Sequence, residues 1–359
     1  MTRAERLTQA LEESRADVFI SAIRSNQLYF LPHPEPSSVL SRANCCAVVF
    51  GLDEPVVFPG IWISNACRDL LKDCTVIENM PGDPPPEEQL LAYLRKVGFN
   101  RVIVDQPELV GALRGQIEGC EVECKDLGTE IRRRKDERDL KHMREAARIA
   151  DLGMTAAFAA IRPGLSCLDV IAEGEYAMLK AGAEDATMAP AVGEGTFYLD
   201  SAENPRRIIR EGDMIFIDMA IHVRGYLGDM TRAGIVGEGT QEQRGIIETV
   251  QRAYRTGAGA MCPGADGADI YRQVVACFAE RGWKEYYVHH LSHGLGLGGD
   301  LPRIGSAAAD VLQVGDALSC EPGVYIPGLG GARVENMIYV GDNGPEELTR
   351  CPLDLPMDL

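Results

Sequence analysis

Two aspartates lie in strand-like runs where a carboxylate needs a compensating partner. Asp218 interrupts the apolar run Met214–Ile221, and Asp229 lies in the next strand-like run, Tyr226–Arg232. The segment His222–Gly225 between them can form a tight turn, and the midpoint of positions 218 and 229 falls inside it. In an antiparallel hairpin the two aspartates would face each other directly, with Cβ atoms about 4.5–5.5 Å apart. Two such carboxylates repel unless one is protonated or a cation lies between them.

A second pair of acidic residues repeats this arrangement. Glu321 and Glu335 lie in two strand-like runs that flank the glycine-rich segment Pro327–Gly331, and their midpoint is Gly328. A hairpin would pair these acids as well, and Arg333 would share the face of Glu335 and could compensate one of the acids. The alternative interpretation is two surface hairpins with ordinary acids on their solvated faces. Two such coincidences in one domain favour a cluster of four carboxylates.

His293 supplies the ligand type that the carboxylates lack. Four carboxylates and one imidazole suit a pair of divalent ions such as manganese, zinc, cobalt or iron. Two ions about 3.5–4 Å apart can hold a bridging hydroxide and polarise a carbonyl. A lone histidine is more often a satisfied core residue, but the glycines that follow His293 let the backbone pass close to a compact group. The residues therefore predict a dinuclear metal centre.

The segment His293–Asp300, HGLGLGGD, also matches the pattern G-x-G-x-x-G between Gly294 and Gly299. A dinucleotide-binding fingerprint requires a hydrophobic strand before the glycines and a helix after them. Here a segment with three histidines precedes the glycines, and Pro302 follows them too early for a continuing helix. We therefore interpret the segment as the loop that delivers His293 and not as a nucleotide loop.

The helices and strands that must position these residues fall into two parts of the chain with different hydrophobic patterns. Residues 1–129 alternate strand-like and helical patterns, which predicts an α/β domain with a largely buried sheet. A charge run near Glu130–Asp136 marks the boundary, and residues 130–359 combine helical patterns with strand runs and glycine-rich turns, an α+β arrangement. Helices are expected at about Asp136–Ile161, Leu168–Ala181, Gln241–Gly257 and Ala268–Gly282.

Charge and composition exclude several classes of partner. The chain of 359 residues has 36 basic and 54 acidic side chains, a formal charge of −18. Such a surface repels phosphate backbones and anionic lipid, so nucleic-acid and membrane-surface binding are not expected. No apolar run approaches the roughly 18 residues of a membrane span, and no secretory segment is evident. We expect a cytoplasmic protein whose 11 cysteines are reduced.

The ordered set of motifs resembles a known family. Asp218, the sequence from Gly225 to Arg232 that contains Asp229, His293-Gly-x-Gly, Glu321-Pro-Gly and Arg333-x-Glu335 look like the five-ligand signature of the aminopeptidase P, prolidase and creatinase family. The resemblance implies a creatinase-like N-terminal domain and a pita-bread C-terminal domain. It implies that Asp218 binds one metal ion, Asp229 and Glu335 bridge both, and His293 and Glu321 bind the second. Glu321 would also relay protons to and from the metal-bound water.

The same resemblance carries expectations about the metal and the assembly. Two divalent ions are implied, manganese first, with zinc, cobalt or iron as alternatives. The family is typically dimeric, and the partner's N-terminal domain often closes the site. The proline-rich loop at residues 31–36, with His33 and Glu35, would then have a role at a partner's site.

This chain departs from the peptidases of the family in their outer-shell histidines. His289, four residues before His293, matches one of them, but Ser201 and Asp300 occupy the positions of the other two. In the peptidases those histidines help to hold the peptide transition state. The shortened segment before Asp300 is similar to non-peptidase members such as the dimethylsulfoniopropionate lyase and ectoine hydrolase branch. Asp300 is thus a candidate general base or substrate contact, and the alternative is a plain turn residue before Pro302.

Three functions remain open at this point. The first is a dinuclear metal-dependent hydrolase that cleaves the C–N bond of a small peptide or amide, with Xaa-Pro cleavage as the default. The second is a non-peptidase enzyme on the same scaffold, either a lyase or a hydrolase of another C–N bond acting on a small zwitterion. The third is a non-catalytic binding module, which the presence of all five ligand positions disfavours.

Overall fold

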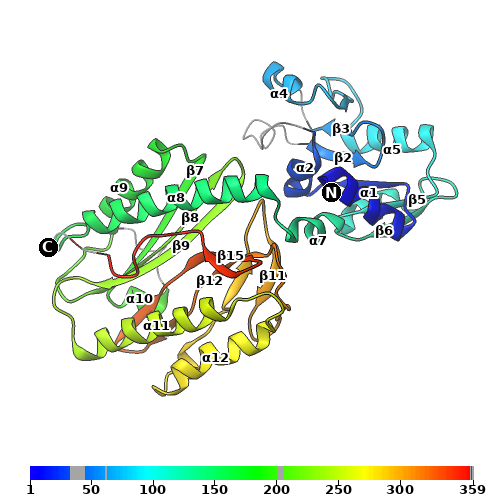
Figure 1. Cartoon of the computed structure of the whole chain (residues 1–359). Coiled ribbons are helices and arrows are strands. Elements are labelled where there is room, and N and C mark those ends of the chain that lie inside the picture. The colour runs from blue at the N-terminus through cyan, green and yellow to red at the C-terminus, as the bar shows by residue number, and fades with distance from the viewer. Residues whose placement is uncertain (33–44, 61–62, 200–205, 356, 358–359) are drawn as a thin grey trace. The chain divides into compact units, whose positions relative to one another are not determined.

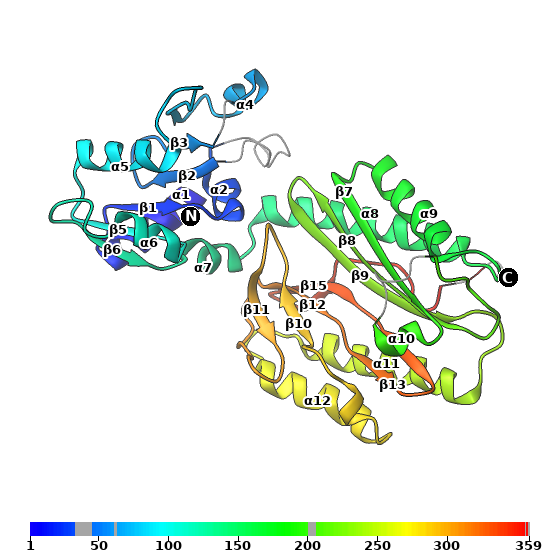
Figure 2. The same cartoon turned by 180° about the vertical axis from the view of Figure 1, so that it is seen from behind.

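The computed structural model describes residues 1–32, 45–60, 63–199, 206–355 and 357. The chain forms two compact units, Met1–Arg132 and Arg133–Leu359 (Figures 1 and 2), and each is described by itself. No helix within the described ranges combines the length and the apolar character needed to cross a membrane.

The first unit is built on one mixed sheet with the strand order β4-β3-β2-β1-β5-β6. Strands β1, β5 and β6 are parallel, whereas β2 pairs antiparallel with both β1 and β3. The strands are β1 (Val18–Ser21), β2 (Cys45–Phe50), β3 (Val56–Pro59), β4 (Thr75–Val76), β5 (Arg101–Val104) and β6 (Glu121–Cys124). The helices are α1 (Arg3–Ser14), α2 (Arg24–Phe30), α4 (Asn65–Leu70), α5 (Pro86–Val97), α6 (Pro107–Leu113) and α7 (Leu127–Arg133). The alternation of helices with a buried sheet confirms the α/β prediction.

The second unit has strands between two pairs of helices (Figures 1 and 2). Helices α8 (Glu137–Ala160) and α9 (Cys167–Lys180) contact the sheet β7-β8-β9, and α11 (Gln241–Ala260) and α12 (Gly267–Ala279) contact the strands on the other side. The remaining elements are β7 (Asp185–Val192), α10 (Gly195–Tyr198), β8 (Met214–Val223), β9 (Tyr226–Ile235), η1 (Lys284–Tyr286), β10 (Ser292–Gly294), β11 (Asp300–Ile304), β12 (Ala317–Cys320), β13 (Gly323–Ile326), β14 (Gly330–Arg333), β15 (Asn336–Gly341) and β16 (Gly344–Glu347). All four helices predicted in this half are present within a few residues of their expected ends.

The sequence explains where the longest helix begins and what it buries. Asp136 caps α8, accepting a hydrogen bond from the backbone N–H of Asp139, whose own carboxylate accepts from the N–H of Asp136. Met154 and Phe158 lie on the face of α8 that packs with buried strand residues such as Ile217. The apolar face of the helix therefore packs against one face of the sheet, and the acidic residues lie at alternate positions on the opposite face.

The β8–β9 hairpin has a different register from the one predicted. Its loop consists of two residues, Arg224 and Gly225, with φ of +55° and +80°, a geometry that suits the right-handed twist of the strands. Asp218 therefore pairs with Thr231, and Asp229 lies two residues away along β9. The prediction that the two aspartates face each other directly was wrong, because it assumed a longer turn. A shift of two residues keeps both carboxylates on one face, as diagonal neighbours.

The second hairpin has the predicted register. The ladders β12–β15 and β13–β14 continue each other, which leaves Glu321 opposite Glu335 at the break between them. At this break the backbone N–H of each glutamate donates to a residue outside the hairpin. The N–H of Glu335 donates to the carbonyl of Thr231 in β9 at 3.0 Å, and the N–H of Glu321 donates to the carbonyl of Leu291 at 2.9 Å. The two predicted hairpins thus meet at their acidic residues.

The glycine-rich segment forms a hairpin and not a strand-loop-helix unit. Strands β10 and β11 pair antiparallel, with Gly294 opposite Asp300. A Cβ atom on Gly294 would lie 2.2 Å from the carbonyl oxygen of Asp300, so this position needs glycine for close strand packing. The geometry agrees with the exclusion of a dinucleotide loop.

Candidate metal centre

The fold brings His293 together with three of the four predicted acids. His293 Nε2 lies 3.4 Å from Oδ2 of Asp229, 3.4 Å from Oε1 of Glu321 and 3.9 Å from Oε1 of Glu335. These residues come from β10, from β9 and from the breaks between β12 and β13 and between β14 and β15. Metal–ligand bonds of about 2.0–2.2 Å place neighbouring ligand atoms about 3.0–3.4 Å apart. The side chains therefore already have close to the spacing of ligands around a divalent ion.

The electrostatics of this cluster call for additional positive charge. Burial raises the pKa of Glu335 well above its usual value, and the charges of Asp229 and Glu321 raise it further. Burial likewise raises the pKa of Asp229, although His293 opposes the shift. Burial alone would lower the pKa of His293, but Asp229 and Glu321 outweigh it and raise the pKa to about 9. A proton or a cation is thus strongly favoured among these groups.

One buried carboxylate oxygen identifies where a cation fits. Oε1 of Glu335 is buried and has no hydrogen-bond partner among the described residues. The other oxygen, Oε2, lies 2.8 Å from the hydroxyl of Thr231. A buried carboxylate oxygen without a partner is costly, and a divalent ion would satisfy it. Ligand atoms of Asp229, His293 and Glu335 lie within 4.8 Å of one another, so the residues present fit a metal ion.

Asp218 is the predicted ligand that stands beside this group. Its Oδ2 pairs with the guanidinium of Arg333, and its Oδ1 lies 3.1 Å from the hydroxyl of Thr231. Thr231 therefore connects Asp218 to Glu335. Arg333 also lies 3.2 Å from the hydroxyl of Tyr325. The expectation that Arg333 compensates one of the acids agrees with this geometry.

His289 lies at the edge of the centre and contacts a tyrosine. Its Nδ1 is 2.8 Å from the carbonyl of His290 and its Nε2 is 2.9 Å from the hydroxyl of Tyr325. Because the carbonyl can only accept, Nδ1 carries the proton and Nε2 accepts from the tyrosine. Burial lowers the pKa of His289, which favours this neutral form. His289, Tyr325 and Arg333 thus form a chain of polar contacts that ends at Asp218.

Asp300 has a different environment from the one predicted. It lies in strand β11, so it is not a turn residue. Its Oδ2 is 2.7 Å from Nζ of Lys135, and the two side chains are only 1% and 2% exposed. A general base must reach the proton that it abstracts. The Asp300 carboxylate is held in a buried ion pair with Lys135, and its role as a base or substrate contact stays a prediction. Ser201, His33 and Glu35 lie outside the described residues.

Several residues of the centre were not singled out from the sequence. Ser319 accepts from the N–H of His293 at 3.1 Å and donates to Oε1 of Glu321 at 2.9 Å, so it fixes two of the proposed ligands. Thr231 and Tyr325 link the acids, Arg333 and His289 as described above. The signal available in the sequence was strand periodicity. Ser319 is two residues from Glu321, and Thr231 is two residues from Asp229, so each shares the face of an acid.

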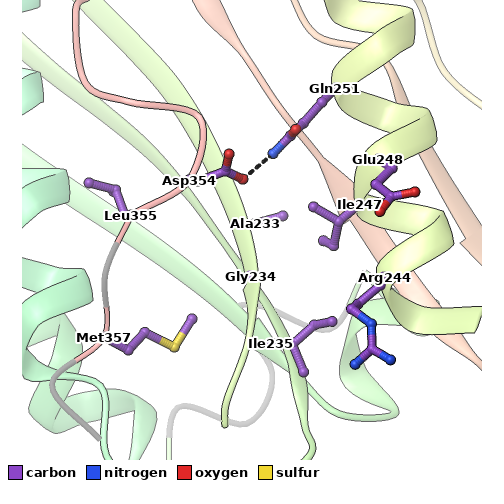
Figure 3. Close-up of a pocket in the computed structure, with 10 residues that line it drawn as sticks. All are labelled: Ala233, Gly234, Ile235, Arg244, Ile247, Glu248, Gln251, Asp354, Leu355 and Met357. Carbon is purple, nitrogen blue, oxygen red and sulfur yellow. Dashed lines mark hydrogen bonds between the residues drawn. The ribbon is translucent and has the colours of Figure 1, made fainter. Parts of the chain in front are cut away.

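Two cavities in this unit differ in their relation to the centre. One, of about 350 Å³, is lined by His289, His290, His293 and Arg303 among others. The other, of about 430 Å³, lies between α11, β9 and the segment near Asp354 (Figure 3). As far as the described residues define it, the lining of this second cavity includes none of the predicted site residues. Of these two cavities, the smaller is lined by histidines of the centre.

Comparisons with known proteins agree with this architecture. Residues 141–342 match the family model of metallopeptidase family M24. The chain is 30% identical over 236 residues to the protein YkvY of Bacillus subtilis (strain 168), and the match covers 65% of each chain. It is 32% identical over 233 residues to an Xaa-Pro dipeptidase of Pyrococcus horikoshii, covering 64% of this chain and 66% of that one. The chain thus spans slightly less than two thirds of the length of these two curated relatives.

The fold itself matches over the whole chain. The structure of an Xaa-Pro dipeptidase from Bacillus anthracis superposes with a TM-score of 0.85 at 23% identity, covering 99% of both chains. The chain therefore has the prolidase-like fold, an α/β N-terminal domain followed by a pita-bread C-terminal domain. The family match covers more than half of the chain and includes the acids and histidines of the centre. On this evidence, the chain belongs to metallopeptidase family M24.

Proposed function

We propose that this protein is a dinuclear metal-dependent hydrolase that cleaves the C–N bond of small peptides of the Xaa-Pro type. The observation that carries the proposal is the cluster of His293 with three carboxylates, in which a buried oxygen of Glu335 has no hydrogen-bond partner among the described residues. The similarity to the Xaa-Pro dipeptidase of Pyrococcus horikoshii supports the substrate class.

Five residues would hold the metal ions. Asp218 would bind one ion, His293 and Glu321 the other, and Asp229 and Glu335 both. Manganese is the ion that a carboxylate-dominated donor set favours, with zinc, cobalt or iron as alternatives. When bound, such ions polarise the scissile carbonyl and lower the pKa of bound water toward neutral pH.

The chain's own residues would handle the proton. Burial raises the pKa of Glu321, but the neighbouring histidines outweigh it, and the pKa lies below the usual value. Glu321 is therefore ionised at neutral pH and can accept a proton from water and return it to the leaving nitrogen. Ser319 would hold this carboxylate in position. Arg333 would keep Asp218 compensated, and His289 would remain a neutral hydrogen-bonding group beside the substrate.

The cavity beside the centre suits a small substrate. Its volume of about 350 Å³ lies at the lower end of ligand pockets, which favours a dipeptide over a long chain. Arg303 in its lining offers a positive charge to a substrate carboxylate. We also propose that the protein acts as a homodimer in the cytoplasm. The ten cysteines whose side chains the structure describes are all free, which fits a reducing compartment.

The test is a substrate panel with metal-depleted protein reloaded with Mn²⁺. The panel contains Xaa-Pro dipeptides, Xaa-Ala dipeptides, a sulfonium acid and a cyclic amidine. We expect metal-dependent release of proline, and a fall in kcat of about 100-fold or more in Glu321→Gln with retained fold. Turnover of the sulfonium acid or the amidine without turnover of Xaa-Pro would instead support a non-peptidase function, which the absence of a histidine at position 300 would then explain. Binding without turnover of any compound would identify a binding module.

A further inference from the structure

The segment before β10 carries two adjacent histidines with different partners. His289 contacts the Tyr325 hydroxyl, whereas His290 Nε2 lies 3.1 Å from Oε1 of Glu321. His293 Nε2 lies 3.4 Å from the same oxygen. The carboxylate of Glu321 therefore contacts two imidazoles, those of His290 and His293. His290 is not among the five proposed ligands.

Oε1 of Glu321 has more polar neighbours than it can accept hydrogen bonds from. The hydroxyl of Ser319 donates to it at 2.9 Å, and the nitrogens of His290 and His293 approach as well. A carboxylate oxygen has two lone pairs. With Ser319 on one of them, two imidazole N–H groups would compete for the other. A cation bound to this oxygen would instead accept the lone pairs of both nitrogens.

The distances match one coordination sphere. Around an ion with bonds of about 2.0–2.2 Å, neighbouring ligand atoms lie about 3.0–3.4 Å apart. The separations from Glu321 Oε1 are 3.1 Å to His290 Nε2 and 3.4 Å to His293 Nε2. One ligand atom from each of these three residues lies within 4.8 Å of the other two. The two imidazole planes are inclined by 73°, with centroids 5.7 Å apart, so the rings do not stack against each other.

We propose that His290 is an additional ligand of the ion held by His293 and Glu321, an inference that rests on the metal centre proposed above. The His290 side chain is 52% exposed and lines the smaller cavity, so an entering ion can reach it. A second imidazole strengthens the binding of zinc and cobalt more than that of manganese, because nitrogen ligands suit the former and carboxylates the latter. His290 therefore tunes which metal this centre prefers.

The test measures metal affinity and counts histidine ligands in the full-length protein. Wild type, His290→Asn and His290→Gln are titrated with Co²⁺ and with Mn²⁺ against a chromophoric chelator. His222→Asn is the matched control, because the His222 side chain is 43% exposed and pairs with Asp185. We expect both His290 variants to lose at least about 10-fold in Co²⁺ affinity and less in Mn²⁺ affinity, and the control to lose neither.

Proton NMR of the Co²⁺ form identifies the ligands directly. Imidazole N–H signals strongly shifted by Co²⁺ should number two in wild type and one in His290→Asn. Unchanged affinity and unchanged signals in the variants would overturn the inference and leave the centre intact. Weaker affinity with the same number of shifted signals would also overturn it, since His290 would then act only as a hydrogen-bond donor to Glu321. Failure of wild type to bind either ion would reject the centre and His290 together.

Discussion

The buried ion pair between Lys135 and Asp300 yields a prediction that separates a structural from a chemical role. The two charged atoms are 2.7 Å apart, and both side chains are almost fully shielded from solvent. Removing one partner takes this contact away from the other buried charge, which costs about 3–5 kcal/mol of unfolding free energy. For a unit of this size, 1 kcal/mol shifts Tm by about 2–4 °C, so Asp300→Asn or Lys135→Met should lower Tm by about 6–20 °C.

A double-mutant cycle measures this effect. Tm and urea unfolding are followed for Asp300→Asn, Lys135→Met, the combined variant and Glu145→Gln, all metal-depleted. The combined variant should lose less stability than the sum of the single variants, because both single variants remove the same contact. Glu145 pairs with Arg148 on the surface, with side chains about half exposed, so its variant should lose less than about 1 kcal/mol. The reasoning would be refuted if Asp300→Asn kept full stability yet abolished turnover, since Asp300 would then be a chemical group.

Three further outcomes follow from the geometry. Metal-depleted protein should lose stability as pH rises from 6 to 9, because the raised pKa values of Glu335 and His293 both favour the folded state at low pH. Glu335→Gln should make this loss of stability with pH smaller. Measurement of Tm against pH checks both statements, and a Tm that rises over that range would contradict them. Ser319→Ala should weaken metal binding by about 10-fold or more with little change in fold, measured by chelator competition. Gly294→Ala should destabilise the protein strongly, because the added Cβ would lie 2.2 Å from the carbonyl oxygen of Asp300. Gly299→Ala should not, because an added Cβ at position 299 meets nothing within 4 Å. Equal Tm values for the two variants would contradict this packing argument.

The periodic patterns of the sequence predicted the elements and the residues that meet at the centre. Buried acids in strand-like runs were informative because an uncompensated carboxylate is too costly to occur in such a position without a partner. The pairing of Glu321 with Glu335 was predicted correctly by placing the turn at the midpoint of the two positions. The same rule gave the wrong pairing for Asp218 and Asp229. The two-residue loop at Arg224 and Gly225 depends on backbone geometry that composition alone does not specify.

The environment of Asp300 was beyond what the sequence could reveal. Its partner Lys135 is 165 positions away, in the segment before α8, and only the folded chain brings the two together. A pattern of neighbours along the chain carries no information about such a pair. His290 was missed for a related reason, since two adjacent histidines in an irregular segment cannot be assigned to different partners without the fold.

The most direct test of the metal centre is calorimetric titration of metal-depleted protein with Mn²⁺. Wild type should bind two ions per chain. Asp229→Asn and Glu335→Gln, which alter the two proposed bridging carboxylates, should lose tight binding of at least one ion while keeping their fold by circular dichroism. If wild type bound no divalent ion, or if both variants bound two ions with unchanged affinity, the assignment of the metal centre would be contradicted.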